Sequence, residues 1–191
     1  MTTHEDFFKK AIDALSSAQI PYMISDSVAT SFHGQPRATK DADIVIAPTK
    51  EQLQNFIQSL GDEYYVSLNA ATQALADNST FNVIDRNSGW KADFIIRKER
   101  PFSICEFQRR CNVTMMGYDF LIVSPEDAIL TRLEWAKNTR SEQQFRDALG
   151  VAVVQWDRLD QGYLQKWAKE LQAERSLGDL LEQAKKLVDS K

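Results

Sequence analysis

The hydrophobic pattern of this chain changes once, at Ser124, and that change limits the fold more than any other feature. Before Ser124, short apolar runs of β type alternate with helical segments, and after it every apolar run has helical spacing. Strands mixed with helices and then helices alone are typical of an α+β protein. We therefore predict an α/β-type mixed sheet in a core over residues 1–123 and an appended helical bundle over residues 124–191, packed on that core.

Turn residues indicate how the predicted strands pair. Strands are expected at residues 22–25, 41–47, 80–85, 90–96, 111–115 and 118–123. The sequence Arg86-Asn87-Ser88-Gly89 is a typical hairpin turn, and Met116-Gly117 predicts a second one. Two antiparallel pairs are therefore expected.

Helix starts are marked by capping residues. Thr49 with Gln52 predicts a capping box. Ser124 followed by Pro125 predicts the start of the first C-terminal helix, and Ser141 the start of the next.

Composition excludes several classes of protein. The chain has 191 residues, 43% of them hydrophobic, enough for one substantial core. No apolar run approaches the ~20 residues of a membrane-spanning helix, and the first residues lack a signal-peptide order, so we expect a cytoplasmic protein without a membrane segment. Two cysteines and two histidines do not have the spacing of a zinc site. A net charge of −4 gives no global attraction for nucleic acid.

Two carboxylates interrupt an otherwise apolar strand. Because residues two apart on a strand share a face, Asp41 and Asp43 lie together while Ala42, Ile44 and Ile46 face the core. Two such carboxylates repel one another unless a cation lies between them. Hard oxygen ligands at this density favour Mg²⁺ or Mn²⁺.

A third acid strengthens this interpretation. Asp93 interrupts the apolar strand 90–96, and an adjacent strand would bring it beside the pair. Three carboxylates at one sheet edge can hold two metal ions, which position a nucleoside triphosphate and activate a hydroxyl. The alternative is that these are strand-end acids in solvent or in salt bridges with Lys40, Lys91 or Arg97.

These residues resemble the nucleotidyltransferase superfamily that includes DNA polymerase beta and the minimal nucleotidyltransferases. Its signature is an apolar residue, Gly, then Gly or Ser, followed roughly ten residues on by Asp-x-Asp or Asp-x-Glu and later by a third acid. Here Ser27 takes the Ser position, and the acids follow at Asp41, Asp43 and Asp93. Residues 34–40 and the helical part from Ser124 onward are similar to small bacterial members related to the abortive-infection toxins of toxin–antitoxin systems.

The resemblance implies a role for each matching residue. Asp41, Asp43 and Asp93 would be catalytic and would ligate two Mg²⁺ or Mn²⁺ ions. The expected nucleotide-binding residues are Ser25, Asp26, Ser27, Arg37, Lys40 and Arg132. The implied activity is transfer of a nucleoside monophosphate from a nucleoside triphosphate to a hydroxyl acceptor, with a toxin-like role and an antitoxin partner left open. A tRNA end, a protein hydroxyl and a small alcohol all fit as acceptor.

One departure from the signature concerns the nucleotide. The family glycine, which lets the backbone approach the terminal phosphates, is Asp26 here. An uncompensated carboxylate ~4 Å from a polyanion would cost of order 1 to 4 kcal/mol. The alternatives are an enzyme in which Asp26 turns away or binds metal, a slow enzyme, and an impaired protein that acts as a regulatory or partner-binding module. A milder departure is Arg132, where relatives often carry lysine.

Overall fold

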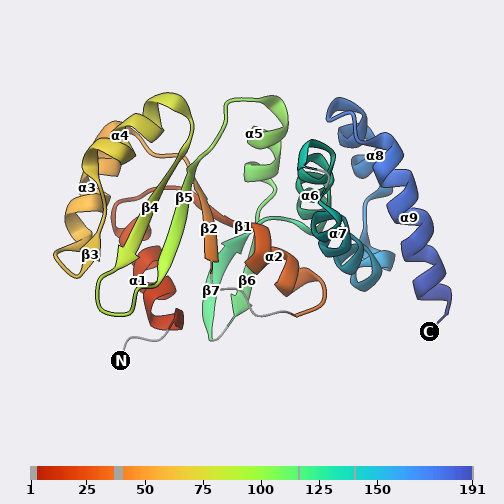
Figure 1. The fold of residues 1–191 in the computed structure, drawn as a ribbon, viewed down its shortest axis with the longest axis horizontal. Helices are drawn as coiled ribbons and strands as arrows, with labels where there is room; N and C mark the ends of the chain where they lie inside the picture. Colours follow the sequence, from red (N-terminus) through yellow and green to blue (C-terminus); the bar gives the residue numbers. More distant parts are fainter. Residues whose placement is uncertain (1–3, 37–40, 116, 140, 191) are drawn as a thin grey trace. The chain divides into compact units, whose positions relative to one another are not determined.

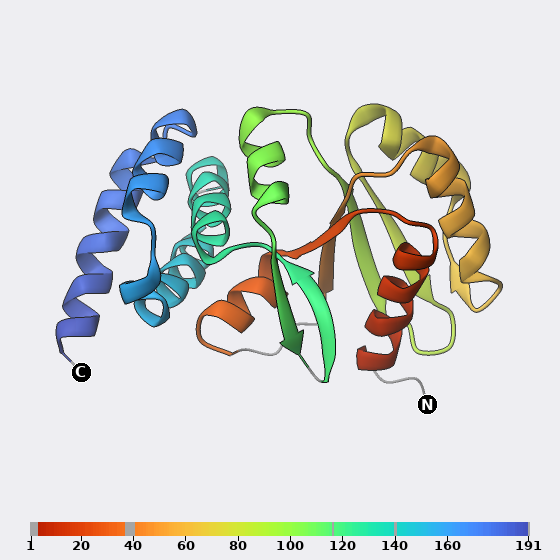
Figure 2. The same ribbon diagram turned by 180° about the vertical axis from the view of Figure 1, so that it is seen from behind.

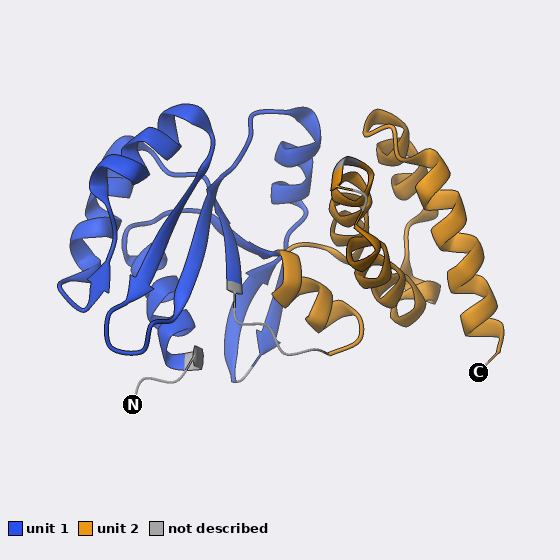
Figure 3. Ribbon diagram, in the orientation of Figure 1, with its two compact units in different colours: residues 1–25, 39–122 blue, residues 26–38, 123–191 orange. Residues whose placement is uncertain are grey.

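The chain divides into two compact units that interleave in sequence. A computed structural model describes residues 4–36, 41–115, 117–139 and 141–190. Unit 1 comprises residues 1–25 and 39–122, and unit 2 comprises residues 26–38 and 123–191 (Figure 3). The predicted division at residue 124 lies beside the later junction, whereas the segment 26–38 groups with the C-terminal helices. The predicted packing of the helical bundle on the core stays a prediction.

Unit 1 is built around a mixed sheet (Figure 1). Its strands are β1 (Tyr22–Ser25), β2 (Asp41–Ile46), β3 (Tyr64–Tyr65), β4 (Thr80–Asp85), β5 (Lys91–Ile96), β6 (Cys111–Met115) and β7 (Tyr118–Ile122). Its helices are α1 (His4–Ser17), α3 (Lys50–Leu60), α4 (Leu68–Asp77) and α5 (Pro101–Gln108). The capping box predicted at Thr49 and Gln52 is confirmed at the start of α3.

The sheet contains both parallel and antiparallel pairs of strands. Within the described residues of unit 1, seven strands follow the order β3-β4-β5-β2-β1-β7-β6. The β2–β5 and β1–β7 pairs are parallel, and the other neighbours are antiparallel. Both predicted hairpins are confirmed, as β4–β5 and β6–β7. The α+β class with a mixed sheet is confirmed as well.

The core of unit 1 covers one face of the central strands. On β2 and β5, alternate residues such as Ile44, Ile46 and Phe94 are fully or almost fully buried. The Phe94 ring lies 5.2 Å from Phe56 of α3 and 5.4 Å from Phe81 of β4, measured between ring centroids. Helix α1 lies in front of the sheet in Figure 2 and behind it in Figure 1. Because side chains alternate along a strand, the remaining residues of β2 and β5 project to the opposite face.

Unit 2 is helical. Its elements are α2 (Asp26–His33), α6 (Pro125–Thr139), α7 (Glu142–Val154), the short 3₁₀ turn Trp156–Arg158, α8 (Gln161–Glu170) and α9 (Glu174–Asp189). As predicted, Ser124 caps the first C-terminal helix, with its hydroxyl accepting the Asp127 N–H at 3.2 Å. In the described part of the chain, no helix is both long and apolar enough to cross a membrane.

The end of α2 contacts the rest of unit 2 at several points. A Cβ on Gly34 would lie 2.9 Å from the Val151 nitrogen of α7, so only glycine allows this close approach. The buried His33 ring lies with Nε2 2.7 Å from the Val123 carbonyl oxygen. The side chain of Gln155 donates to the His33 carbonyl at 2.8 Å. These contacts explain why the segment 26–38 belongs to unit 2.

The burial of His33 predicts a pH dependence of stability. Burial lowers the pKa of His33 below 6.5, although the bond to Val123 and the charge of Glu126 act in the opposite direction. Because the unfolded chain then binds the proton first, this contribution to stability is complete above pH 6.5 and falls as the pH drops below it. We expect His33→Gln to remove that part of the slope of unfolding free energy against pH, measured by urea denaturation. His4→Gln is the matched control, and an unchanged slope in His33→Gln would contradict the assignment.

Candidate functional site

Two of the three predicted acids face one another across neighbouring strands. In the parallel β2–β5 pair, Asp43 is in register with Asp93, and Asp41 is in register with Lys91. Partners in a parallel pair project to the same face, so these positions share the face opposite the core. The side chain of Asp41 lies outside the described residues. The structure thus brings Asp43 and Asp93 together, as the sequence predicted for an adjacent strand.

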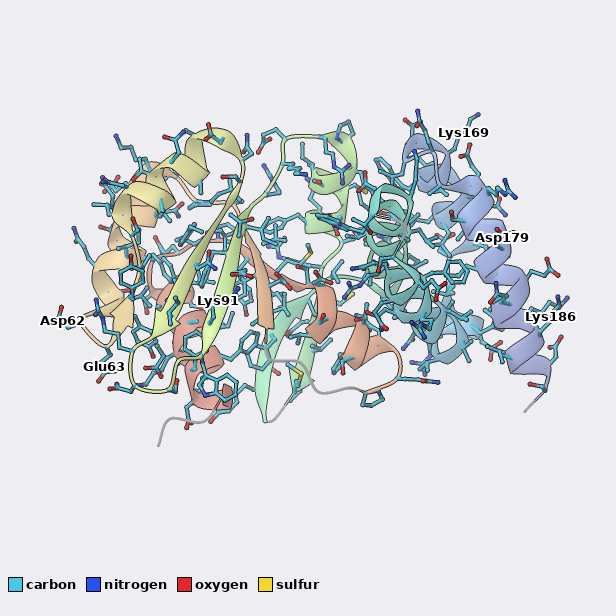
Figure 4. The ribbon with its side chains drawn as sticks, viewed as in Figure 1. Asp62, Glu63, Lys91, Lys169, Asp179 and Lys186 are labelled. Carbon is cyan, nitrogen blue, oxygen red and sulfur yellow. The ribbon has the colours of Figure 1, made fainter. Side chains whose placement is uncertain are left out.

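The carboxylate of Asp93 is held at both oxygens. Asn82 of β4 donates from Nδ2 to Oδ1 at 2.7 Å. Lys91, labelled on β5 in Figure 4, lies with Nζ 3.1 Å from Oδ2. The salt bridge with Lys91 was one of the alternatives open in the sequence, whereas Asn82 was not anticipated. The hairpin turn Arg86–Gly89 could have identified it, because that turn sets Asn82 opposite Asp93.

The register continues to a third strand. Ser25, at the end of β1, is paired with Asp43 in the antiparallel β1–β2 ladder. Its hydroxyl lies 3.4 Å from the Asp43 carbonyl oxygen, and the residue is buried. Asn82, Asp93, Asp43 and Ser25 therefore form one row of polar residues across β4, β5, β2 and β1.

The donor set of this row fits a divalent cation of the Mg²⁺ type. Asp43 and Asp93 supply hard carboxylate oxygens from adjacent strands, which lie about 4.8 Å apart in a sheet. Asp41 shares their face by its position in the strand. Among the described side chains, no group of three or more His, Cys, Asp and Glu residues is arranged to hold a metal ion. The third predicted ligand, Asp41, has a side chain outside the described residues.

The predicted phosphate ligand Arg132 is the buried centre of a polar cluster in unit 2. Its side chain is 5% exposed and forms an ion pair with Asp26. The carboxylate of Asp147 on α7 lies 3.7 Å from the same nitrogen, Nη2. Gln144 accepts a hydrogen bond from Nη1. A guanidinium buried to this extent requires such partners, because an unpaired buried charge is costly.

Asp26 begins α2 with a backbone conformation that favours glycine. Its φ is +54°, in the left-handed region, which explains the glycine at this position in the family that the sequence resembles. Aspartate tolerates this region better than most residues because its short side chain forms local polar contacts. Here the carboxylate pairs with Arg132, so the negative charge that the sequence placed near the phosphates is compensated within unit 2.

Two hydroxyls of α2 complete the surroundings of Arg132. Nη2 lies 3.5 Å from Ser27 Oγ and 3.4 Å from Thr30 Oγ1, both long hydrogen bonds. Ser27 was predicted as a phosphate contact, and Thr30 was not anticipated. The other predicted phosphate ligands, Arg37 and Lys40, lie outside the described residues.

A pocket lined mainly by polar residue types adjoins this cluster. It has a volume of about 260 Å³ and is lined by Thr30, Ser31, Gln35, Pro36, Gln143, Arg146, Asp147 and Gly150. Thr30 and Asp147 both also contact Arg132. The pocket therefore shares two side chains with the surroundings of the buried guanidinium.

Comparison with known proteins finds the same fold in solved structures. The antibiotic-resistance factor ANT(2'')-Ia, also solved in complex with adenylyl-2''-tobramycin, matches 96% of this chain over 97% of its own, with 14% identity and a TM-score of 0.56. The lincosamide antibiotic adenylyltransferase LnuA, solved with lincomycin bound, matches 80% of this chain over 98% of its own, with 12% identity and a TM-score of 0.54. A nucleotidyltransferase-like protein from Paracoccidioides brasiliensis matches 90% of this chain over 89% of its own, with 16% identity and a TM-score of 0.56.

No family model and no curated protein matches the sequence. The likeness in structure nevertheless extends over most of this chain and of each neighbour. The protein therefore has the nucleotidyltransferase fold that its sequence predicted.

Proposed function

We propose that this protein transfers a nucleoside monophosphate from a nucleoside triphosphate to a hydroxyl acceptor. The observation that carries the proposal is the register of Asp43 with Asp93 on two parallel strands, with Ser25 at the same level of β1. The fold supports it, because the neighbours include a lincosamide adenylyltransferase and a resistance factor solved with an adenylylated antibiotic. In the transfer, the acceptor oxygen bonds to the α-phosphorus while the bond to the bridging oxygen breaks and pyrophosphate leaves.

The acids have distinct roles in this proposal. Asp41 and Asp43 would hold two Mg²⁺ or Mn²⁺ ions, with Asp93 as a further ligand. When bound, such ions neutralise the triphosphate and lower the pKa of the attacking hydroxyl. Asp93 would accept the proton of that hydroxyl, since Asn82 holds its carboxylate in a fixed orientation.

The phosphate side of the proposal depends on Arg132. A guanidinium can hold two phosphate oxygens at once, and Ser27 offers a hydroxyl next to it. Arg37 and Lys40 would add charge at the triphosphate. Because Asp26 now pairs with Arg132, we propose that a phosphate group replaces that carboxylate, so that one anion is exchanged for another at the buried guanidinium.

The structural neighbours suggest which class of acceptor to test. LnuA was solved with lincomycin, and ANT(2'')-Ia with an adenylylated tobramycin, both small hydroxyl-bearing molecules. We propose a small hydroxyl-bearing molecule as the acceptor of this chain too. A tRNA or protein acceptor, which a toxin-like role with an antitoxin would require, is the contrary outcome of an acceptor screen.

Removal of the central carboxylate tests the proposed chemistry. We expect Asp43→Asn to lower nucleotidyl transfer at least about 100-fold, because the cation loses a ligand in the middle of the row. Incorporation of label from an α-³²P-labelled triphosphate into a panel of small alcohols, in the presence of Mg²⁺, measures it. The matched control is Asp62→Asn, which removes one exposed charge after α3 of the same unit. Full transfer by Asp43→Asn would rule out the metal-dependent mechanism.

Neutralising Asp26 tests the exchange of anions. Asp26→Asn keeps the size of the side chain and its tolerance of a positive φ, but removes the charge that competes for Arg132. We expect nucleoside triphosphates to bind about tenfold more tightly to this variant, measured by isothermal titration calorimetry with Mg²⁺.

The ion pair between Asp26 and Arg132 also predicts an effect of the same substitution on thermal stability. Without nucleotide, Asp26→Asn should melt at a lower temperature than the natural protein, because Arg132 loses its nearest counter-ion. Asp179→Asn on α9 of unit 2 is the matched control for the loss of one charge. Equal triphosphate affinity in the natural protein and Asp26→Asn would mean that the carboxylate does not occupy the phosphate position. Absence of binding in both would instead favour a regulatory or partner-binding module.

A further inference from the structure

Lys91 brings a positive charge onto the face of the sheet that carries the candidate metal ligands. Lys91 lies two residues before Asp93 on β5, so its side chain projects to the same face as that of Asp93. In the ladder with β2 it is in register with Asp41. Its ammonium lies 3.1 Å from Asp93 Oδ2, and the Lys91 and Asp93 side chains are 37% and 22% exposed. A cation built into the chain therefore already occupies one side of the Asp93 carboxylate.

Asn82 acts on the other oxygen of the same group. Its amide nitrogen lies 2.7 Å from Asp93 Oδ1, and the antiparallel β4–β5 register places Asn82 directly opposite Asp93. The amide is neutral, so it can orient the carboxylate without neutralising it. The two neighbours of Asp93 therefore differ in kind, one being a counter-ion and the other a hydrogen-bond donor.

We propose that Lys91 competes with a divalent cation for Asp93 and so sets the metal affinity of the site, while Asn82 is a positioning residue that orients Asp93 for either cation. This inference rests on the metal site of the proposed function. Lysine suits an exchangeable role, because its ammonium is a compact charge on a flexible stem that can swing away. Asn82 can keep its bond during that exchange, because it occupies the oxygen that Lys91 does not.

The two roles predict changes of opposite sign. Without Lys91, a divalent cation no longer has to break an ion pair, which for a partly exposed pair corresponds to about a two- to fivefold gain in affinity. Without Asn82, the Asp93 carboxylate keeps its ion pair with Lys91 but loses the hydrogen bond that orients it, and loss of a hydrogen-bonding neighbour of a metal ligand costs about 10-fold in affinity or more. General damage to the sheet would weaken binding in both variants.

The experiment is a titration of the full chain with Mn²⁺ alone, followed by isothermal titration calorimetry and by the electron paramagnetic resonance signal of free Mn²⁺. Lys91→Met and Asn82→Ala are compared with the natural protein. Lys98→Met is the matched control, since it removes an exposed lysine that follows the same strand. We expect tighter Mn²⁺ binding in Lys91→Met, weaker binding in Asn82→Ala and no change in Lys98→Met, with folding verified by circular dichroism.

Unchanged or weaker Mn²⁺ binding in a folded Lys91→Met protein would overturn the competition, and unchanged binding in Asn82→Ala would overturn the positioning role. Mn²⁺ binding that is detected in Lys91→Met but not in the natural protein would support the competition by Lys91 most strongly. The proposed function fails on a different result, namely nucleotidyl transfer that persists in Asp43→Asn.

Discussion

The parallel pairing of β2 with β5 is the constraint on which the candidate site depends. It places residues far apart in sequence side by side, and a shift by one residue would turn Asp93 toward the core while Asp43 stayed on the open face. The register is fixed by the buried half of each strand, where Ile44 lies beside Phe94 within the aromatic cluster of Phe56 and Phe81. The apolar packing on one face thus specifies the arrangement of the carboxylates on the other.

In each unit, a charged residue of the proposed site forms an ion pair with another residue of the chain. In unit 1 an ammonium lies against Asp93, and in unit 2 a carboxylate lies against Arg132. Each is a partner of opposite charge from within the chain, and each has the sign of the ligand proposed for that site. These charges are neutralised without any ligand, so the cation and the phosphate that we propose would each have to displace an internal partner.

Local signals in the sequence were sufficient for most of the fold. The turn at Arg86–Gly89 predicted the β4–β5 hairpin, and Thr49 predicted the start of α3, because turn and cap chemistry depend on residues close in sequence. Helix α4 escaped prediction because its buried residues, Ala71 and Ala74, are too small to give a clear apolar period. Helix α5 buries Ser103 and Glu106 beside two phenylalanines, which hides its pattern as well.

The contacts within the candidate site were harder to predict from short stretches of sequence. The sequence supplied the acids and the departure from glycine at residue 26, but it held no signal that Asp26 would pair with Arg132, more than a hundred residues later. The positive φ of Asp26 was implied only by the glycine of the resemblance. Long-range ion pairs of this kind are set by tertiary packing, which hydrophobic periodicity does not encode.

The interleaving of the two units has a consequence for the evolution and engineering of this chain. Helix α2 lies between β1 and β2 in the sequence but belongs with the C-terminal helices, so the backbone passes from one unit to the other three times. A gene fragment that ends at residue 122 would therefore carry a helix without its partners, and a fragment that starts at residue 123 would lack one. Neither unit can be exchanged as one continuous stretch of sequence, because each consists of two separate segments.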